Sequence, residues 1–248
     1  RNLRRQQKSF YYYEWGNCYA AAPEVERSTA TTLAGYRETQ SLGLWVAGSR
    51  VQSSWAHADE ATSPFELKAH VLHLFERLGV SERSLRAEAI ECDLFAGRAY
   101  RYATYDGKAI ALLGQVSSTL LTKWDIDLPV YYAEINWDNL NRLSERVKVE
   151  ITDLPKFPIV RRDLSLLLDE QITFAELAET ARRAEKKLLR DVTLFDVYEG
   201  KNLPAGKKSY ALSFYLQDTE RTMSDKQIDA IMAKIRKSIE DTHGASLR

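Results

Sequence analysis

The side chains best suited to binding chemistry lie in or directly before three short segments of alternating residues, 162–169, 192–198 and 208–217. Successive side chains of a β-strand point to opposite faces, so each segment divides into two sets. The apolar set is expected to lie under helices: Leu164, Leu166, Leu168, Phe195, Val197, Tyr210, Leu212, Phe214 and Leu216. The opposite set is small and polar with two aromatic rings: Arg161, Asp163, Ser165, Asp196, Tyr198, Ser209, Ala211, Ser213 and Tyr215.

Tyr198 points to the face that the apolar residues of its own segment do not use. An exposed π-face surrounded by hydroxyl and carboxylate groups suits single-stranded RNA, whose unstacked bases lie on rings and form hydrogen bonds through their edges. We interpret Tyr198 as the stacking platform and Tyr215 as a second ring of the same surface. The candidates for contact with base edges are Ser209, Ser213, Asp163 and Asp196. The candidates for contact with phosphates are Lys207 and Lys208, beside Tyr198, and Arg161, at the far end of the strands.

A simpler interpretation stays open, because exposed tyrosine and serine are favoured on many solvent-facing strands and a fold alone licenses no function. The basic stretch that includes Arg182 and Arg190 lies within a predicted helix on the opposite side of the sheet. We interpret it as a solvated face rather than part of the same site.

The elements that position these residues follow the order β-α-β-β-α-β from residue 151 to 248, which is the ferredoxin-like arrangement. The predicted strands are 162–169, 192–198, 208–217 and 245–248, and the predicted helices are 174–189 and 225 to about 241. Thr173 with Glu176, and Ser224 with Gln227, have the spacing at which a side chain and a backbone N–H satisfy each other at the start of a helix.

Residues 1–150 predict an antiparallel sheet with helices, so the whole chain is of the α+β class. Strands are expected at 8–19, 41–48 and 130–137, and a helix from Pro64 to Leu78 before Gly79. Asp106-Gly107 predicts a type I′ hairpin turn, and Asp138 is the expected cap of a short helix. Pro155 and Pro158 interrupt regular structure and mark the expected boundary between the two units.

Composition limits the function classes. Lys+Arg and Asp+Glu both number 35, so the chain has no net charge to attract a polyanion and any such partner must meet a local patch. Cys18 and Cys92 stand alone, which argues against a disulfide framework and suits a reducing cytoplasm. No long apolar run predicts a membrane span. The first methionine is Met223, so we expect a fragment of a longer chain.

The sequence specifies no catalyst and no metal site. Glu66, His70 and His73 have helical spacing that could present metal ligands, but no fourth ligand motif accompanies them, and a solvated flank is the favoured interpretation. No nucleophile motif of the GxSxG type and no glycine-rich phosphate-binding loop is present.

The second unit resembles the ferredoxin-fold anticodon-binding domain of the bacterial phenylalanyl-tRNA synthetase β subunit. The matching motifs are Phe157-Pro158, Arg161 to Asp163, Phe195 to Tyr198, and Gln217 to Thr222. The first unit is similar, more weakly, to the class II synthetase-like module of that subunit, which does not perform aminoacylation. Gly97-Arg98 is the nearest remnant of an ATP-binding arginine after a glycine-rich run.

This resemblance implies an α2β2 enzyme of the cytoplasm that attaches phenylalanine to its tRNA using ATP and magnesium. The chemistry would belong to the α subunit, and the β subunit would supply structure, editing and contact with the anticodon. The fragment itself is then expected to have no catalytic residue, no metal and no cofactor. Its partners would be the anticodon stem-loop of phenylalanine tRNA and the α subunit, against which the first unit would bury apolar surface.

Two rival hypotheses come from other function classes. A ferredoxin-like regulatory domain would bind a small metabolite, but it predicts a glycine-rich turn from strand to helix, and Asp169 to Thr173 contains no glycine. An independent enzyme would require a buried cleft with converging titratable groups in the first unit.

Overall fold

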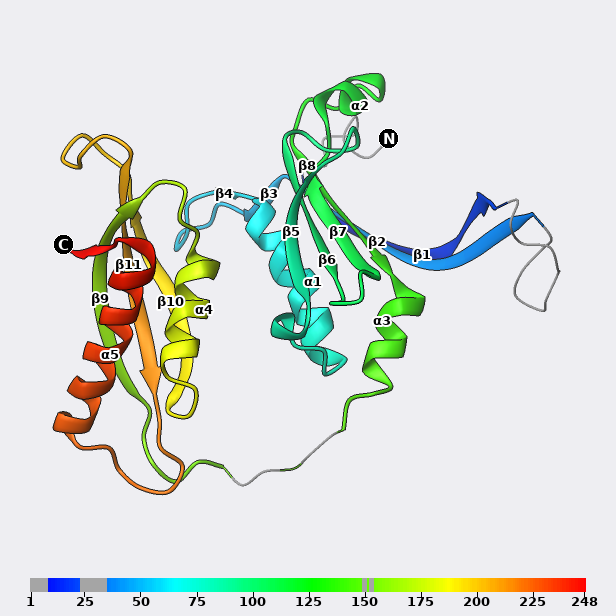
Figure 1. Cartoon of the computed structure of the whole chain (residues 1–248). Helices are drawn as coiled ribbons and strands as arrows, with labels where there is room; N and C mark the ends of the chain where they lie inside the picture. Colours follow the sequence, from blue (N-terminus) through cyan, green and yellow to red (C-terminus); the bar gives the residue numbers. More distant parts are fainter. Residues whose placement is uncertain (1–8, 23–34, 149–150, 152–153) are drawn as a thin grey trace. The chain divides into compact units, whose positions relative to one another are not determined.

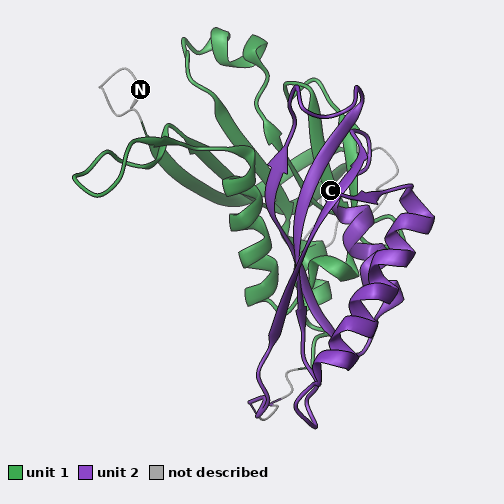
Figure 2. Cartoon of the chain, turned by 90° about the vertical axis from the view of Figure 1, so that its left-hand side faces the viewer, with its two compact units in different colours: residues 1–150 green, residues 151–248 purple. Residues whose placement is uncertain are grey.

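A computed structural model describes residues 9–22, 35–148, 151 and 154–248. The chain divides into two compact units, residues 1–150 and residues 151–248 (Figure 2). Both units combine antiparallel sheets with helices, which confirms the α+β class. None of the helices in the described ranges is long and apolar enough to cross a membrane.

The first unit is built on a six-stranded antiparallel sheet in the order β1-β2-β8-β7-β6-β5 (Figure 1). Its strands are β1 (Phe10–Ala21), β2 (Tyr36–Ala47), β5 (Arg86–Glu91), β6 (Arg98–Ala103), β7 (Ala109–Gln115) and β8 (Val130–Asn136). Two short strands, β3 (Ser49–Val51) and β4 (Glu60–Ala61), form a separate ribbon. The helical elements are α1 (Pro64–Arg77), the 3-10 turn η2 (Glu82–Ser84), α2 (Ser118–Lys123) and α3 (Trp137–Ser144).

Helices α1 and α3 pack on one face of this sheet, because their apolar stripes share a core with alternate residues of the strands. Leu67, Val71 and Phe75 of α1 are fully buried there, and Leu140 of α3 lies in the same cluster. The expected helix from Pro64 is therefore present, with Gly79 beyond its end at a positive φ of 74°.

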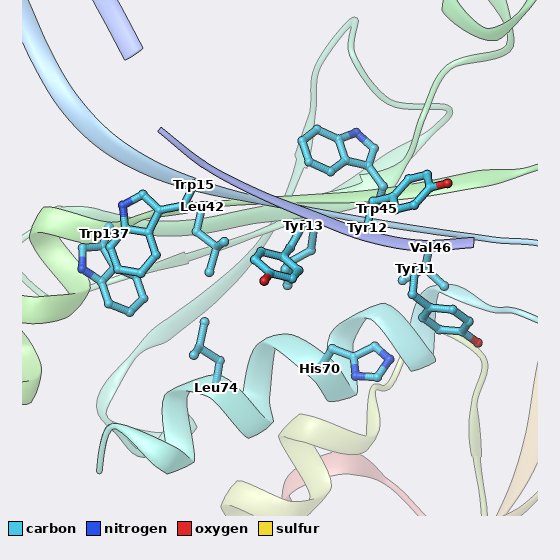
Figure 3. Close-up of a pocket in the computed structure, with 11 residues that line it drawn as sticks. Tyr11, Tyr12, Tyr13, Trp15, Leu42, Trp45, Val46, His70, Leu74 and Trp137 are labelled. Carbon is cyan, nitrogen blue, oxygen red and sulfur yellow. The ribbon is translucent and has the colours of Figure 1, made fainter. Parts of the chain in front are cut away.

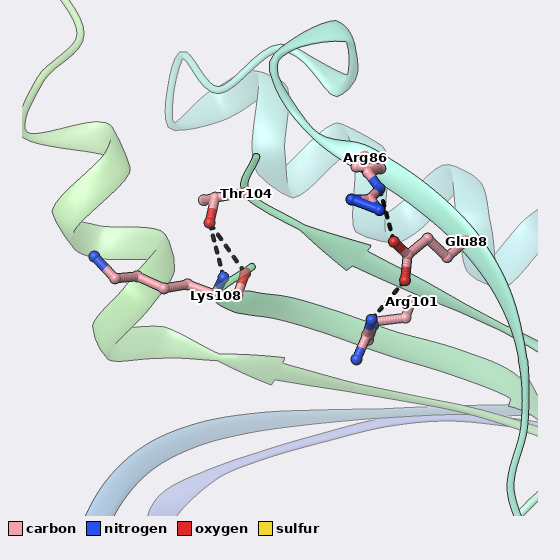
Figure 4. A network of polar contacts seen from close by, with 5 residues as sticks. All are labelled: Arg86, Glu88, Arg101, Thr104 and Lys108. Atoms are coloured by element: carbon pink, nitrogen blue, oxygen red, sulfur yellow. Dashed lines mark hydrogen bonds and ion pairs between the residues drawn. The ribbon is translucent and has the colours of Figure 1, made fainter. Parts of the chain in front are cut away.

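The turn between β6 and β7 differs from the predicted type I′ hairpin. Gly107 has a φ of 87°, but Asp106 does not have positive φ, which a type I′ turn requires. Instead the Gly107 N–H donates to Thr104 O (2.9 Å) and the Thr104 N–H donates to Lys108 O (2.9 Å), closing a three-residue loop with glycine in the left-handed region. The Thr104 hydroxyl, which accepts from the Lys108 N–H at 3.0 Å, stabilises this loop (Figure 4).

An ion-pair network joins the edge strand β5 of this sheet to its neighbour β6 (Figure 4). Glu88 lies between Arg86 (Nε to Oε1, 2.7 Å) and Arg101 (Nη2 to Oε2, 2.5 Å). The hydrogen bond from Arg101 is the main cause of a lowered pKa at Glu88. The network joins residues of both strands, and it therefore fastens the edge strand β5 to β6.

The cap of α3 was predicted wrongly. The side chain of Asn136, not Asp138, accepts from the Asn139 N–H at 2.9 Å. Asp138 lies one residue inside the helix, where its carboxylate accepts from the Gln40 N–H of β2 at 3.0 Å. Both residue types are good N-caps, and the end of β8 at Asn136 places the boundary two residues earlier than expected.

The second unit is a four-stranded antiparallel sheet with two helices on one face (Figure 2). The chain order is β9 (Val160–Asp169), α4 (Phe174–Ala184), β10 (Leu189–Tyr198), β11 (Lys207–Leu216), α5 (Asp225–His243) and β12 (Ser246–Leu247). The spatial order β10-β11-β9-β12 is that of the ferredoxin-like fold. Helices α4 and α5 bury their apolar residues, including Leu177 and Ile235, against one face of the sheet.

Helix α4 ends at Ala184, five residues before the predicted end, and β10 begins at Leu189. The basic stretch predicted as one helical face is therefore divided. Arg182 and Arg183 belong to α4, Lys186 and Lys187 lie in the connection, and Arg190 belongs to β10. This connection is closed by the Glu185 carboxylate, which accepts from the N–H groups of Lys187 (3.0 Å) and Leu188 (3.2 Å).

The start of α4 offers a test of the fold. The Glu176 carboxylate accepts from the Thr173 N–H (2.7 Å), and the Thr173 hydroxyl accepts from the Glu176 N–H (3.4 Å), completing the expected capping box. We expect Thr173→Ala to lower the free energy of unfolding of the second unit by about 1 kcal/mol, measured by urea denaturation with far-ultraviolet circular dichroism.

Tryptophan fluorescence supplies the internal control, because all five tryptophans lie in residues 1–150 and report the first unit alone. Its unfolding midpoint should not move in the Thr173→Ala variant. Thr173→Ser keeps the hydroxyl acceptor and should behave as the unaltered chain. Equal stability of the alanine variant would contradict the capping assignment.

Candidate nucleic-acid interface on the open sheet face

The face of the four-stranded sheet opposite α4 and α5, called here the open face, carries most of the residues predicted for it. The strand register places Arg161 opposite Tyr215, Asp163 opposite Ser213, and Ser165 opposite Ala211. On the other side of β11, Tyr198 lies opposite Ser209 and Asp196 opposite Ala211. Neighbours across strands share a face, so the antiparallel pairing brings these residues onto one surface.

Tyr198, the last residue of β10, is partly buried and contacts Arg248. The Arg248 guanidinium carbon lies 4.7 Å from the centroid of the Tyr198 ring, within the range of a cation–π contact. The Arg248 N–H donates to Ser165 O (3.1 Å), which places this residue beside β9. Sequence reasoning did not include Arg248 in the site, although the predicted strand at 245–248 already placed it at the sheet.

The tyrosine hydroxyl lies close to Gly200. A Cβ atom at position 200 would be 2.8 Å from the Tyr198 hydroxyl oxygen and 2.9 Å from the ring carbon that bears it. Because glycine has no Cβ, position 200 leaves room for the Tyr198 ring. Any larger residue at this position would push the ring away from its present place on the open face.

The two serines of β11 on the open face, Ser209 and Ser213, are its most buried polar residues. Ser209 is 3% exposed and Ser213 is 1% exposed. The Ser209 and Ser165 hydroxyl oxygens are 3.5 Å apart, at the limit of a hydrogen bond. Both serines are therefore buried, whereas Asp196 is exposed to solvent.

Arg161 and Asp163, two residues apart on β9, form a two-pronged ion pair. The Arg161 Nε donates to Asp163 Oδ1 at 2.8 Å and its Nη2 donates to Oδ2 at 3.0 Å. This hydrogen bonding is the main cause of a lowered pKa at Asp163 and of a raised pKa at Arg161. The pair fixes the plane of the guanidinium over the open face.

The two lysines predicted for phosphate contact lie on different faces. Lys207 shares the open face with Ser209, and its Nζ is 2.7 Å from the Asp169 carboxylate. Lys208 was assigned wrongly, because it points to the helix-covered face and is 6% exposed. Its Nζ donates to Glu170 O (2.7 Å) and lies 4.5 Å from the centroid of the Tyr210 ring, so Lys208 cannot share a surface with Tyr198.

A β-bulge in β10 overturns the prediction that Phe195 is a core residue. Leu194 pairs with Leu212 and Asp196 with Ala211, which leaves Phe195 as an extra residue in the strand. Phe195 is 54% exposed, and the Arg161 guanidinium carbon lies 5.4 Å from the centroid of its ring. Phe195 therefore belongs to the open face. Strict alternation missed it, since nothing in the sequence marks where one residue leaves the register.

Val197, the other residue of β10 assigned to the core, is 47% exposed. It pairs with the buried Tyr210, so it is on the helix-covered side, but β10 is an edge strand and this end of it extends beyond the core cluster. Leu189, Val192 and Leu194 supply the core contacts of β10 in its place.

The first unit has an apolar groove between β1, β2 and α1, with a volume of about 390 Å³ (Figure 3). We call it the aromatic groove; its lining includes Tyr11, Tyr13, Trp15, Leu74 and Trp137. The Trp15 and Trp137 ring centroids are 4.1 Å apart. On the opposite face of the sheet, Trp45 packs on Tyr132 with ring centroids 4.9 Å apart.

Two of the three candidate metal ligands of α1, Glu66 and His70, contact Tyr11 of the aromatic groove instead. The Tyr11 hydroxyl donates to Glu66 Oε1 at 2.7 Å, and the His70 ring packs edge-on against Tyr11 with centroids 6.0 Å apart. Burial, followed by the hydrogen bond to Glu66, raises the pKa of Tyr11 to about 12. Within the described ranges, no group of three or more His, Cys, Asp or Glu side chains is placed to hold a metal ion.

The Arg161–Asp163 pair gives a pH prediction. A carboxyl whose pKa is lowered in the folded state stabilises the fold at neutral pH, and this contribution is lost as the pH falls through that lowered pKa. We expect Arg161→Ala to raise the Asp163 pKa toward its usual range, measured by carboxyl ¹³C NMR during acid titration. The Asp218 pKa is lowered chiefly by the Glu220 N–H and serves as the control; an unmoved Asp163 pKa would show that the pair does not form in solution.

Comparison with known proteins assigns a family to each unit. Residues 155–248 match the family model described as "Ferredoxin-fold anticodon binding domain". Residues 1–137 match the model described as "Phenylalanyl tRNA synthetase beta chain CLM domain". The matches cover the open face and the aromatic groove respectively.

The whole chain is similar to curated proteins named phenylalanine–tRNA ligase beta subunit. It is 51% identical over 247 residues to that of Porphyromonas gingivalis, covering 100% of this chain and 30% of the relative. It is 46% identical to that of Bacteroides thetaiotaomicron, with the same coverage, and 33% identical to that of Geobacillus kaustophilus, covering 100% of this chain and 29% of the relative. The chain thus spans about 30% of the length of these relatives. It belongs to the phenylalanyl-tRNA synthetase β-chain family.

Proposed function

We propose that the second unit binds the anticodon stem-loop of phenylalanine tRNA on its open face. The observation that carries this proposal is the contact of two aromatic rings, the exposed Phe195 and the partly buried Tyr198, with arginines on a sheet face that carries small polar residues. The description of the matched family model, an anticodon-binding domain, supports the same role. A four-stranded sheet whose aromatic residues stack unpaired bases is a recurrent way of recognising RNA.

The part of the RNA that each side chain contacts would depend on its exposure. Tyr198 stacks on an anticodon base, with Tyr215 as a further ring on the same face. Asp196, which is exposed, contacts a base edge directly. Asp163, Ser209 and Ser213 reach base edges only after a local rearrangement, because both serines are buried and Asp163 is held by Arg161.

Arg161 and Lys207 would contact phosphates. Lys208 would not, because it is buried on the other face. Both cations are already paired with aspartates in the free chain, so RNA must compete with Asp163 and Asp169 for them. With equal numbers of acidic and basic residues in the whole chain, we expect modest affinity that falls with salt. Much of the affinity of the full enzyme for tRNA would then come from its other parts.

The Tyr198 assignment is tested by titrating the chain with a labelled anticodon stem-loop. We expect Tyr198→Ala to weaken binding by about 1–3 kcal/mol, the value of one base stacked on an aromatic ring. Val197→Ala is the matched control, because Val197 is the neighbouring residue, is exposed, and lies on the other face. Unchanged affinity in Tyr198→Ala would reject the stacking role, and equal binding of a stem-loop with an altered anticodon would reject anticodon recognition.

We further propose that the chain is part of an α2β2 phenylalanyl-tRNA synthetase of the cytoplasm, which joins phenylalanine to its tRNA using ATP and magnesium. We assign the catalysis, ATP and magnesium to the remainder of the enzyme, and to this chain a role in structure and tRNA contact.

The aromatic groove is the surface that we assign to the α subunit. Tyr13 is 78% exposed and Trp15 is 50% exposed, beside a groove with apolar walls. Exposed apolar surface of this kind is typical of protein interfaces, where tyrosine and tryptophan often dominate the binding energy.

We expect Trp15→Ala to reduce assembly of the β subunit with the α subunit by at least about 2 kcal/mol, measured by sedimentation of the mixed subunits. Trp55→Ala is the control, because Trp55 is fully exposed and lies outside the groove. Normal assembly of the Trp15 variant would place the α-subunit contact elsewhere.

A further inference from the structure

The bulge at Phe195 gives the open face a second aromatic ring paired with an arginine. Tyr198 contacts Arg248 near one end of β10, and Phe195 contacts Arg161 further along the same strand. We propose that Phe195 and Arg161 form a second base-stacking position, distinct from Tyr198, which holds another unpaired nucleobase of the bound RNA. This inference rests on the proposed RNA-binding function and adds a ligand position to it.

The ring of Phe195 does not contribute to the hydrophobic core of the second unit. It is absent from the core cluster of the second unit, and more than half of its surface is exposed. In a regular strand Phe195 and Tyr198, three residues apart, would point to opposite faces. The extra residue between Leu194 and Asp196 places both rings on the open face, and bulges are over-represented next to active sites.

Arg161 is held in a geometry suited to stacking. The Asp163 carboxylate accepts two hydrogen bonds from it, at 2.8 Å and 3.0 Å, which leaves the guanidinium faces free of that interaction. A planar cation of fixed orientation can stack on a base, as arginines do in RNA complexes. The phenylalanine side chain has no polar atom, so stacking on Phe195 would tolerate any base. This contact would fix the position of a nucleotide without discriminating among bases.

The spacing along β10 suits two separate bases. Three residues of a strand span roughly 10 Å at about 3.3 Å per residue, and the bulge shortens this distance. Adjacent bases in a stack are much closer, so the two rings would hold nucleotides splayed apart. Sheets of this size commonly stack two or three bases on their aromatic residues.

The test uses the 248-residue chain and anticodon stem-loops of phenylalanine tRNA that carry the fluorescent base 2-aminopurine at one loop position at a time. Stacking on a ring changes the fluorescence of the probe at that position. We expect Phe195→Ala to weaken binding about 5- to 150-fold and to abolish the change at one loop position. Tyr198→Ala should abolish it at a different position.

Three further variants separate stacking from folding and from charge. Val197→Ala removes an exposed apolar side chain from the other face of β10 and should bind as the unaltered chain does. Phe195→Trp restores a larger ring and should recover affinity and fluorescence change, whereas Phe195→Leu should not. Arg161→Lys keeps the charge without the planar group, and should lose the fluorescence change while the salt dependence of binding stays the same.

The outcomes distinguish this inference from the function on which it rests. If Tyr198→Ala weakens binding while Phe195→Ala binds normally, the second position is refuted and the RNA-binding function stands. If both variants act on the same loop position, there is one stacking site and not two. If the unaltered chain does not bind any of the stem-loops, the proposed function fails and the second position fails with it.

Discussion

The candidate site of the second unit depends on the antiparallel register between β9 and β11, because α4 and α5 cover only one face of their sheet. Each residue pair of this register commits one set of side chains to the helices and the alternate set to solvent. Leu166 and Leu212 are fully buried under the helices, while Asp163 and Ser213 meet on the opposite face. A shift of one residue would bury the charges and expose the leucines, so the hydrophobic core itself specifies which groups RNA could meet.

This dependence explains what the sequence could predict and what it could not. Alternation placed Arg161, Asp163, Ser209 and Ser213 on the open face, because regular pairing holds along the whole of β9 and β11. It also placed Tyr198 there, because Tyr198 pairs with Ser209 beyond the irregular part of β10. It failed at Phe195, where β10 carries one extra residue. The assignment of Lys208 departed from alternation, since it placed two adjacent lysines on one surface although neighbours in a strand point to opposite faces.

The errors in local structure have a common physical origin. The end of α4 at Ala184 and the cap at Asn136 were placed wrongly because several nearby residues suit each boundary, and tertiary contacts choose among them. Asp106-Gly107 has the composition of one turn type and adopts another, because the Thr104 hydroxyl stabilises a loop one residue longer. Strong signals such as the Thr173–Glu176 capping box, in which both partners satisfy each other, were predicted correctly.

The aromatic residues of the two units differ in what they contact, and this difference bears on their partners. In the first unit rings pack on rings, as Trp15 does on Trp137 and Phe10 on Tyr12, at centroid distances of 4.1 Å and 5.0 Å. Aromatic rings that pack on each other and stay partly exposed gain from burial against another protein. In the second unit Phe195 and Tyr198 each contact an arginine. A ring beside a cation offers both stacking and phosphate neutralisation, a combination that a nucleic acid uses fully and an apolar protein surface does not.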